Sequence, residues 1–396
     1  MSDNATGSLD GYDIFSEGYR NRPADYWGDL AQSRCPISRT EKWGGSWMLV
    51  RYQDVYDVIQ NPDTYSSRAV EVAGEIPAPG RGLMMPPITS AVPEHADHRA
   101  LIDPLLSPAA VKVMEPFIRE TAAQLAADLA AKGGGDAAAE FARPLALSVL
   151  TRIMDLPRDM QGQFVDWATR ILRLGPTDQA LRRDTLLEVM AFLEEMIAAR
   201  RGQGGSDAIS VMADATIDGE PIDRKHMLGT LLELVIAGAD TTWSTIGASL
   251  LHLASSPEDR ARLVADPTLI KSAVEEFLRA FAPVTVARIS TTDVEVHGRC
   301  IHANDRVIMP LAAANRDPEV FEDPDVVKID RRRNRHMAFG TGTHRCAGAH
   351  LARAELNIAI EEWLKVIPEF ELVGPDVEWA QGQVRGPESI VFKVSA

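Results

Sequence analysis

The sequence FGTGTHRCAG, residues 339–348, places one cysteine, Cys346, among three glycines. Glycine lets the backbone fold tightly around a sulfur and turn its N–H groups toward it. Residues 349–355 read as the start of a helix, and the positive end of a helix dipole favours a thiolate over a thiol. We therefore expect this loop to hold an anionic sulfur. The alternative is a buried, unreactive cysteine, because free cysteine commonly behaves as a small core hydrophobe.

The same residues resemble the heme-binding loop of the cytochrome P450 family, whose pattern is Phe-x-x-Gly-x-x-x-Cys-x-Gly. Phe339, Gly342, Cys346 and Gly348 match every fixed position, and residues 351–353 match the Leu-Ala-Arg of the longer bacterial form. The resemblance implies heme b (iron protoporphyrin IX) as the cofactor, with Cys346 as the ligand of its iron. Such a thiolate pushes electron density toward O–O cleavage.

Composition restricts the class of protein. The chain has 396 residues, of which 45% are hydrophobic and 25% charged, which is ample for a large core. Its net charge of −16 argues against a nucleic-acid partner, which requires a basic surface. Three cysteines form no disulfide framework and suit a reducing cytoplasm, where we expect the protein. We expect no membrane segment, because neither a signal pattern nor an apolar run of about 18 residues is present.

Hydrophobic periodicity predicts a mainly α chain with a small β region and no linker that would divide it, so residues 1–396 are treated as one domain. Short strands are expected at 46–50, within 284–310 and near the C-terminus. Residues 68–93 are rich in Pro and Gly and read as a long functional loop. Helices are predicted at 52–59, 94–105, 108–131, 143–155, 159–173, 179–202, 223–255, 258–265, 268–281 and 347–366.

The longest predicted helix, 223–255, has an unusual middle. Asp223 is a plausible N-cap, and Ser-Ser-Pro ends the helix. Residues 237–242 read Ala-Gly-Ala-Asp-Thr-Thr, and a glycine beside two β-branched threonines is a poor choice for a helix interior. We therefore expect a bulge or kink, a device that helices often place at functional sites. The alternative is a helix crossing that uses small residues for close packing.

These residues also resemble the oxygen-binding motif of the cytochrome P450 family, which reads small-Gly-x-acid-Thr. On that resemblance, Ala237 and Gly238 leave room for O₂ beside the heme. Thr241 hydrogen-bonds the oxygen or a water, and Asp240 helps to relay protons from solvent. Both are therefore assigned as catalytic, since O–O cleavage needs protons delivered within hydrogen-bond reach.

Glu233 departs from the family pattern, which usually has an apolar residue at this position. It lies one helical turn before Ala237 and two before Thr241, so helical spacing places all three near one face. One interpretation is a carboxylate turned to solvent or paired locally. The other is a substrate-binding residue that recognises a polar or basic group.

Four cations are candidates for binding the two heme propionates. His95 and Arg99 are four residues apart in a predicted helix and can point the same way. They resemble the family's His-x-x-x-Arg pair, Arg288 resembles its strand arginine, and His344 resembles the partner beside the cysteine. The cofactor-binding residues implied by the resemblance are His95, Arg99, Ala237, Gly238, Arg288, Phe339, Gly340, His344, Cys346 and Gly348.

Glu276 and Arg279 are three apart in a predicted helix and match the family's Glu-x-x-Arg motif. In isolation, such a pair is a surface salt bridge worth under about 1 kcal/mol. The resemblance implies a buried structural pair instead, joined by a third residue from the later irregular segment, for which Arg331 is the candidate.

The resemblance covers almost the whole chain in family order, with some likeness to camphor-hydroxylase-type members around residues 206–210. It implies the cytochrome P450 fold, a single triangular domain, and a soluble bacterial heme-thiolate monooxygenase. Such an enzyme inserts one atom of O₂ into a C–H or C=C bond of a small apolar substrate. Its electrons come from a separate ferredoxin or flavodoxin. Lys112, Arg345 and Arg353 are candidate docking points for this partner, and the alternative is that they are ordinary surface charges. The apolar substrate wall is assigned to Ile236, Val284 and Val286.

Two alternatives remain open at this stage. One is a peroxide-driven peroxygenase or a non-oxygenating heme-thiolate enzyme, against which Asp240 and Thr241 argue. The other is a heme-binding sensor without turnover, which residue types alone do not exclude.

Overall fold

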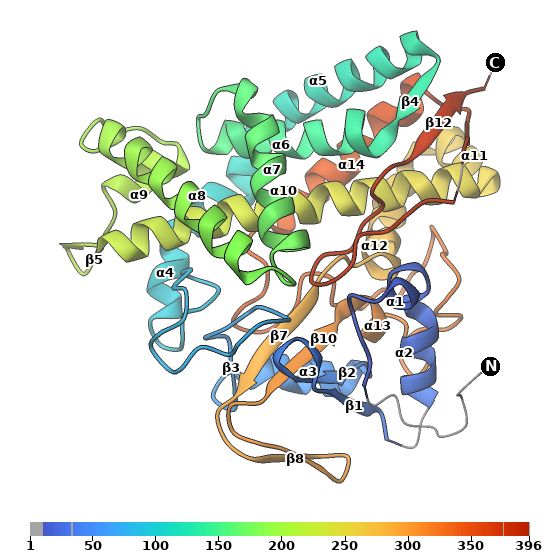
Figure 1. Cartoon of the computed structure of the whole chain (residues 1–396). Helices are drawn as coiled ribbons and strands as arrows, with labels where there is room; N and C mark the ends of the chain where they lie inside the picture. The colour runs from blue at the N-terminus through green and yellow to red at the C-terminus, as the bar shows by residue number, and fades with distance from the viewer. Residues whose placement is uncertain (1–10, 33–34, 375, 396) are drawn as a thin grey trace.

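The computed structural model describes residues 11–32, 35–374 and 376–395, and it is mainly helical (Figure 1). The helices are α1 (Glu17–Asn21), α2 (Pro23–Gln32), α3 (Tyr52–Gln60), α4 (His95–Ile102), α5 (Pro108–Lys132), α6 (Arg143–Ile153), α7 (Gln161–Ala168), α8 (Gln179–Arg200), α9 (Ala208–Ala213), α10 (Arg224–Ser255), α11 (Pro257–Ala265), α12 (Ile270–Ala280), α13 (Leu311–Ala314) and α14 (Ala349–Val366).

The strands are short and gather into small sheets. They are β1 (Ile37–Thr40), β2 (Ser46–Leu49), β3 (Tyr65–Ser66), β4 (Gly134–Asp136), β5 (Thr216–Ile217), β6 (Glu220–Pro221), β7 (Thr285–Ser290), β8 (Val294–Val296), β9 (Arg299–Ile301), β10 (Arg306–Pro310), β11 (Phe370–Leu372) and β12 (Val391–Val394). The largest sheet has the order β1-β2-β10-β7-β3, in which only the β10–β2 pair is parallel. A second sheet has the order β11-β12-β4, and β5-β6 and β8-β9 form separate pairs.

Helix α10 organises the helical part of the molecule. The Asp223 side chain caps it by accepting a hydrogen bond of 2.7 Å from the backbone N–H of His226. The helix crosses the molecule, with α5, α6 and α14 above it and the five-stranded sheet below it in Figure 1. It packs directly against α6 and α14, and α14 lies along α5. Most of its side chains are therefore buried.

The predicted bulge at residues 237–242 is wrong, because α10 is α-helical throughout Arg224–Ser255. The hydroxyl of Thr241 does donate to the carbonyl oxygen of Ala237, at 2.8 Å, one turn earlier. A buried helix that packs against neighbours on several sides keeps its backbone hydrogen bonds despite such a side-chain contact, because tertiary packing overrides weak helix propensity.

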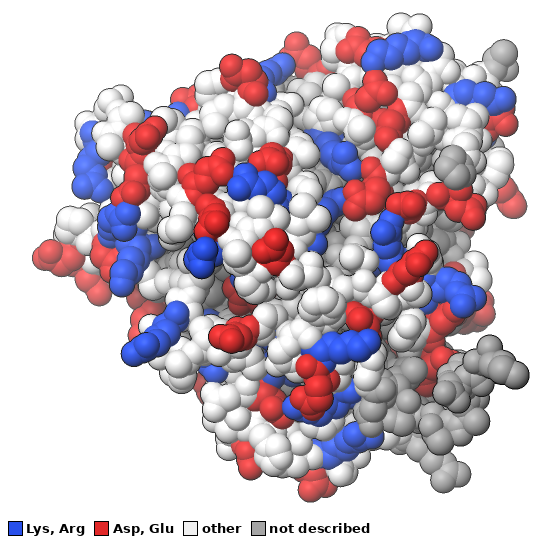
Figure 2. All heavy atoms as spheres, in the orientation of Figure 1, with Lys and Arg blue, Asp and Glu red and all other residues white. Residues whose placement is uncertain are grey.

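The described surface carries charges of both signs. On the face drawn in Figure 2, Lys and Arg side chains alternate with Asp and Glu, without a large region of either sign. Among the described residues, no helix combines the length and the apolar character needed to cross a bilayer.

Candidate active site

A cavity of ≈350 Å³ lies between α10 and the loop that carries Cys346. It is lined mainly by apolar side chains, and it also receives residues from α4, β7 and α14. All the residues that the sequence assigns to heme or substrate line this cavity: Glu233, Ile236, Val284 and Val286, together with His95, Arg99, Ala237, Gly238, Arg288, Phe339, Gly340, His344, Cys346 and Gly348. Thr241 lines it too, whereas Asp240 does not.

The loop 339–348 owes its shape to its glycines. Gly340 and Gly342 have φ values of 62° and 64°, a region in which side-chain-bearing residues are strained. The backbone N–H of Cys346 donates to the carbonyl oxygen of Phe339 at 2.9 Å and closes the loop. Gly348 then stands at the N-cap of α14. The cysteine sulfur is thus presented at the cavity wall just before a helix begins.

The electrostatics of the thiol differ in part from the sequence expectation. Burial raises the pKa of Cys346, and the backbone N–H of Gly348 and the guanidinium of Arg99 lower it by less. The Gly348 N–H and Arg99 thus favour the charged sulfur, as the loop sequence predicts, while burial disfavours it. A bound metal cation would supply the missing charge, because a thiol that coordinates a metal ion is deprotonated outright.

A contact that the sequence did not predict holds this loop against α12. Glu275 accepts hydrogen bonds from Nε and Nη2 of Arg353, at 2.6 and 2.9 Å, and lies 2.9 Å from Nε2 of His336. Although burial acts to raise it, the pKa of Glu275 falls to about 2, because His336 and Arg353 stabilise its charged form. The guanidinium of Arg353 also lies 4.5 Å from the ring centroid of Phe339. Arg353 is therefore engaged within the protein, and its role as a docking charge stays a prediction.

Glu276, Arg279 and Arg331 form a second cluster, in which Glu276 and Arg279 are fully buried and Arg331 is partly exposed. The carboxylate of Glu276 accepts from Arg279 and from Nε of Arg331, the latter at 2.9 Å. Arg279 also donates to the carbonyl oxygens of Asn315 and Pro324, at 2.9 and 2.7 Å. The cluster thereby ties α12 to the irregular segment that precedes the Cys346 loop.

The four predicted cations meet at one side of the cavity. His95 and His344 lie edge to face with ring centroids 4.4 Å apart. Arg99 donates to Asp103 at 2.7 Å and to the carbonyl oxygen of Arg345 at 2.8 Å. Burial, followed by the nearby cations Arg288, His95 and Arg99, lowers the pKa of His344 to about 3.

Two observations at these residues indicate that an anionic group binds beside them. Arg288 is 6% exposed, and the one hydrogen bond of its side chain to a described residue goes to the carbonyl oxygen of Ala287 at 2.7 Å. Its burial lowers its pKa to about 10. Nδ1 of His344 is buried without a partner in the described part of the chain, while Nε2 lies 3.0 Å from the hydroxyl of Ser67. A buried guanidinium without a carboxylate is costly, and heme propionates would neutralise it.

One face of α10 forms the opposite wall. Glu233, Ala237 and Thr241 follow one another at intervals of four residues, and all three line the cavity. No described residue hydrogen-bonds or forms an ion pair with the carboxyl group of Glu233, and burial raises its pKa to about 8. A second carboxyl that the sequence did not single out, Glu355 on α14, is buried with Oε2 unpaired among the described residues.

Asp240 faces away from the cavity, toward Arg173. The Asp240 carboxylate is fully buried, and it accepts from Nη2 of Arg173 at 2.6 Å, from Nε of Arg173 at 3.3 Å and from the hydroxyl of Ser244 at 3.2 Å. Arg173 also contacts Glu388, which is 36% exposed. Asp240 is thus connected to the surface through one arginine, which the sequence could not reveal because 67 residues separate the partners.

Residues 167–373 match the family model of cytochrome P450. The chain belongs to the cytochrome P450 family. Among curated relatives, it is 33% identical to a probable cytochrome P450 127A1 of Sinorhizobium fredii, with 85% of this chain and 80% of the relative covered. It is likewise 33% identical to the nocardicin C N-oxygenase of Nocardia uniformis, with 85% and 86% covered.

Solved P450 structures have the same fold. The polyketide synthase P450 PksS of Bacillus subtilis superimposes with a TM-score of 0.87 at 27% identity, covering 97% of this chain and all of that one. A testosterone complex of CYP109E1 from Bacillus megaterium gives 0.87 at 27% identity, covering 96% and 100%. The protein is thus a bacterial-type P450 monooxygenase that uses heme b and O₂, as predicted. The heme, when bound, supplies the oxygen-activating chemistry, and Cys346, His95, Arg99, Arg288 and His344 are the residues that would hold it.

Proposed function

We propose that this P450 oxidises a small, largely apolar substrate that carries a basic nitrogen, and that the carboxylate of Glu233 binds the protonated nitrogen. The observation that carries the proposal is an unpaired carboxyl group in an apolar cavity. Ile236, Val284 and Val286 contribute to the apolar lining and would contact the hydrocarbon part of the substrate.

Among the residues that the structure describes, the charges around the cavity leave Glu233 without an internal counterion. Arg182 lines the same cavity but lies 3.0 Å from Glu71, with which it is paired. Arg99 is paired with Asp103. A buried carboxyl without a partner is rarely retained for stability, because burial penalises its charged form. A cationic ligand removes that penalty and gains a charge-assisted hydrogen bond.

The relatives are compatible with a substrate of this kind. One relative at 33% identity is named as an N-oxygenase, so a nitrogen-containing substrate can be processed by this fold. In the present proposal, however, the nitrogen is held at Glu233 and the oxidised atom lies elsewhere in the substrate.

Proton delivery would involve Thr241 and Asp240. The Thr241 hydroxyl lies on the cavity wall and donates its single proton to the carbonyl oxygen of Ala237, so it can accept a hydrogen bond from a water there. To donate to oxygen, it would first have to turn away from Ala237. Asp240 is held by Arg173, so it must leave this contact before it can carry a proton from solvent toward Thr241.

We further propose that a separate ferredoxin or flavodoxin supplies the electrons. Lys112 and Arg345 are both exposed, and Arg345 directly precedes Cys346. Two cations on the cysteine side of the heme would attract an acidic redox partner.

The test compares matched ligands on the heme-loaded enzyme. Pairs of amines and isosteric hydrocarbons are titrated while the heme Soret band is followed. We expect amines to bind more tightly and to move the band toward shorter wavelength, as displacement of axial water does. A shift toward longer wavelength would place the nitrogen on the iron and contradict the proposal.

The pH dependence sharpens this test. Because the pKa of Glu233 is raised to about 8, binding a cation at lower pH must expel a proton. The amine affinity should therefore rise about tenfold per pH unit up to about pH 8 and then level off. Glu233→Gln should remove both the preference and the pH dependence. The control Glu220→Gln removes one exposed carboxylate outside the cavity and should change neither.

A further inference from the structure

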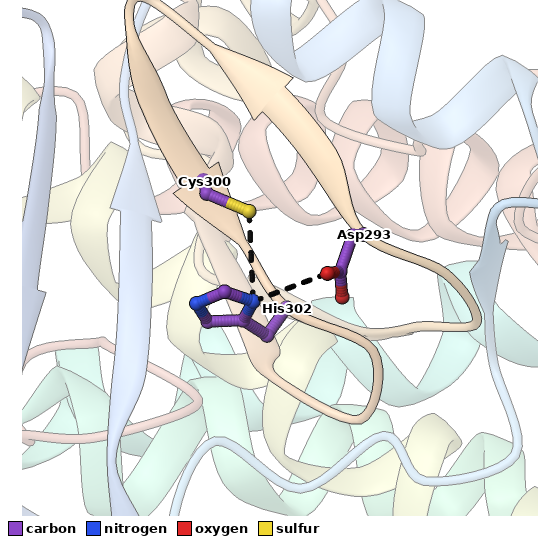
Figure 3. Close-up of side chains that lie close together, drawn as sticks. All are labelled: Asp293, Cys300 and His302. Carbon is purple, nitrogen blue, oxygen red and sulfur yellow. Dashed lines mark hydrogen bonds and ion pairs between the residues drawn. The ribbon is translucent and has the colours of Figure 1, made fainter.

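We propose that the β8–β9 hairpin carries a zinc site formed by Asp293, Cys300 and His302. In Figure 1 this hairpin projects at the lower edge of the molecule. None of the three residues lines the heme cavity. Figure 3 shows the three side chains pointing toward one another, with His302 between the other two.

The strand register brings the three donors to one face. Val294 pairs with Ile301 and Glu295 with Cys300, so Asp293 stands opposite His302 at the open end of the hairpin. Since side chains alternate between the faces of a strand, Asp293, Glu295, Cys300 and His302 all belong to the same face. The other face carries Ile301, which is buried.

The distances are those of a tetrahedral zinc site. Zinc bonds of about 2.3 Å to sulfur and about 2.0 Å to nitrogen or oxygen place adjacent donors roughly 3.3–3.5 Å apart at a tetrahedral angle. Sγ of Cys300 lies 3.5 Å from Nδ1 of His302, and that nitrogen lies 3.4 Å from Oδ2 of Asp293. All three donor atoms lie within 4.8 Å of one another, so side-chain rotation alone can close the third edge.

Hydrogen bonds by themselves leave this arrangement incomplete. Nδ1 of a neutral imidazole bears either a proton or a free lone pair. As long as the Cys300 thiol is neutral, Nδ1 of His302 can donate a hydrogen bond to Asp293 or accept one from Cys300. It cannot do both. A cation at the centre of the three atoms satisfies all of them.

The surroundings hold two of the ligands in place. The other carboxylate oxygen of Asp293 accepts from the backbone N–H of Ala303 at 2.8 Å. The backbone N–H of His302 donates to Asp305 at 3.0 Å, and Asp305 also accepts from Trp47 at 2.8 Å. Such secondary contacts orient metal ligands and typically change affinity about 10- to 100-fold.

The donor set selects the metal. Thiolate, imidazole and carboxylate together suit Zn²⁺, whereas Mg²⁺ and Ca²⁺ prefer oxygen ligands alone. All three residues are exposed, so an ion can enter directly from solvent. The fourth position would be filled by water or by Glu295. The ion would join the two chain ends of the hairpin and protect the otherwise free thiol of Cys300 from oxidation.

The test measures zinc in the untagged, heme-loaded enzyme after equilibration at micromolar free Zn²⁺. We expect one equivalent per chain, bound at least about tenfold more weakly in Cys300→Ser and in His302→Ala. The matched control is His297→Asn, which changes the histidine at the turn of the same hairpin, where it pairs with Asp54 at 2.8 Å. It should retain full affinity.

Substitution by Co²⁺ provides a second readout, because thiolate ligation adds a charge-transfer band that Cys300→Ser should lack. Stoichiometric zinc retained in both ligand variants, or no zinc in the parent enzyme, would overturn the site. Neither measurement requires substrate or turnover, so its outcome is independent of the proposed role of Glu233.

Discussion

Glu276 and Arg279 are joined by two hydrogen bonds of 2.8 Å, and both side chains are completely excluded from solvent. The same carboxylate accepts from Arg331, from Asn334 at 3.1 Å and from the backbone N–H of Lys328 at 2.8 Å. One carboxylate on α12 thus organises the segment that leads to the Cys346 loop. Removal of one member would leave the other charge buried and unpaired.

Glu276→Gln should therefore destabilise the enzyme by about 3–5 kcal/mol, the usual cost of breaking a buried ion pair from one side. Denaturant unfolding of the heme-loaded enzyme gives this value. The matched control is Glu194→Gln, which breaks the ion pair with Arg224 on the exposed surface and should cost about 1 kcal/mol or less. Equal losses in the two variants would show that the buried pair has no special role.

Arg353→Ala should weaken heme retention more than it weakens the fold. Arg353 bridges Glu275 and the ring of Phe339, so its loss frees the loop on the cysteine side of the heme. The measurement is the rate of heme transfer to an acceptor protein, together with the band near about 450 nm of the reduced carbon monoxide complex, which reports thiolate ligation. Arg333→Ala changes an exposed arginine that does not line the cavity and is the control. An unchanged transfer rate in Arg353→Ala would exclude the bridge as a support of the loop.

Glu233 should make the substrate-free enzyme less stable as the pH rises. Its pKa is about 8 in the folded protein and 4.5 in the unfolded chain. Between these values the folded state holds a proton that the unfolded state has released, so the free energy of unfolding falls with increasing pH. Glu233→Gln lacks this contribution, and its stability advantage over the parent enzyme should grow from about pH 4.5 to about pH 8. A pH-independent difference between the two would contradict an uncharged, buried carboxyl.

Asp240→Asn should slow turnover about 100-fold or more, since a positioned general acid typically contributes a factor of this size. Heme content and ligand affinity should remain unchanged, because Asp240 does not line the cavity. A larger solvent isotope effect on product formation would identify proton delivery as the affected step. Ser244→Ala removes only the 3.2 Å hydrogen bond to the carboxylate and should have a small effect. A similar loss of turnover in both variants would argue for a structural role.

The sequence predicted most helices well because their signals are local. Asp223 at the start and Ser255-Ser256-Pro257 at the end fixed α10 to within a residue. The sequence also predicted the tight turn of the Cys346 loop, because glycine is the residue best suited to positive φ values such as those of Gly340 and Gly342. The family and its cofactor followed from that loop.

The sequence could not predict the ion-pair partners of the site residues. Arg173 reaches Asp240 across 67 positions and Arg353 reaches Glu275 across 78, and no periodicity encodes such contacts between helices. The bulge expected in α10 is absent for the same reason, because packing from several neighbours decides the helix geometry there. The sequence therefore named the residues around the heme, while their counterions came from the structure.

The unbroken α-helical geometry of α10 has a consequence for where a substrate is oxidised. Glu233 and Thr241 are eight residues apart on one continuous helix, which corresponds to roughly 12 Å along its axis. An amine bound at Glu233 would place near Thr241 whichever carbon of the substrate lies at that distance from its nitrogen. In a homologous series of linear amines, the hydroxylated carbon should therefore stay the same number of carbons from the nitrogen as the chain is lengthened. The distance along the helix would then set the position of oxidation.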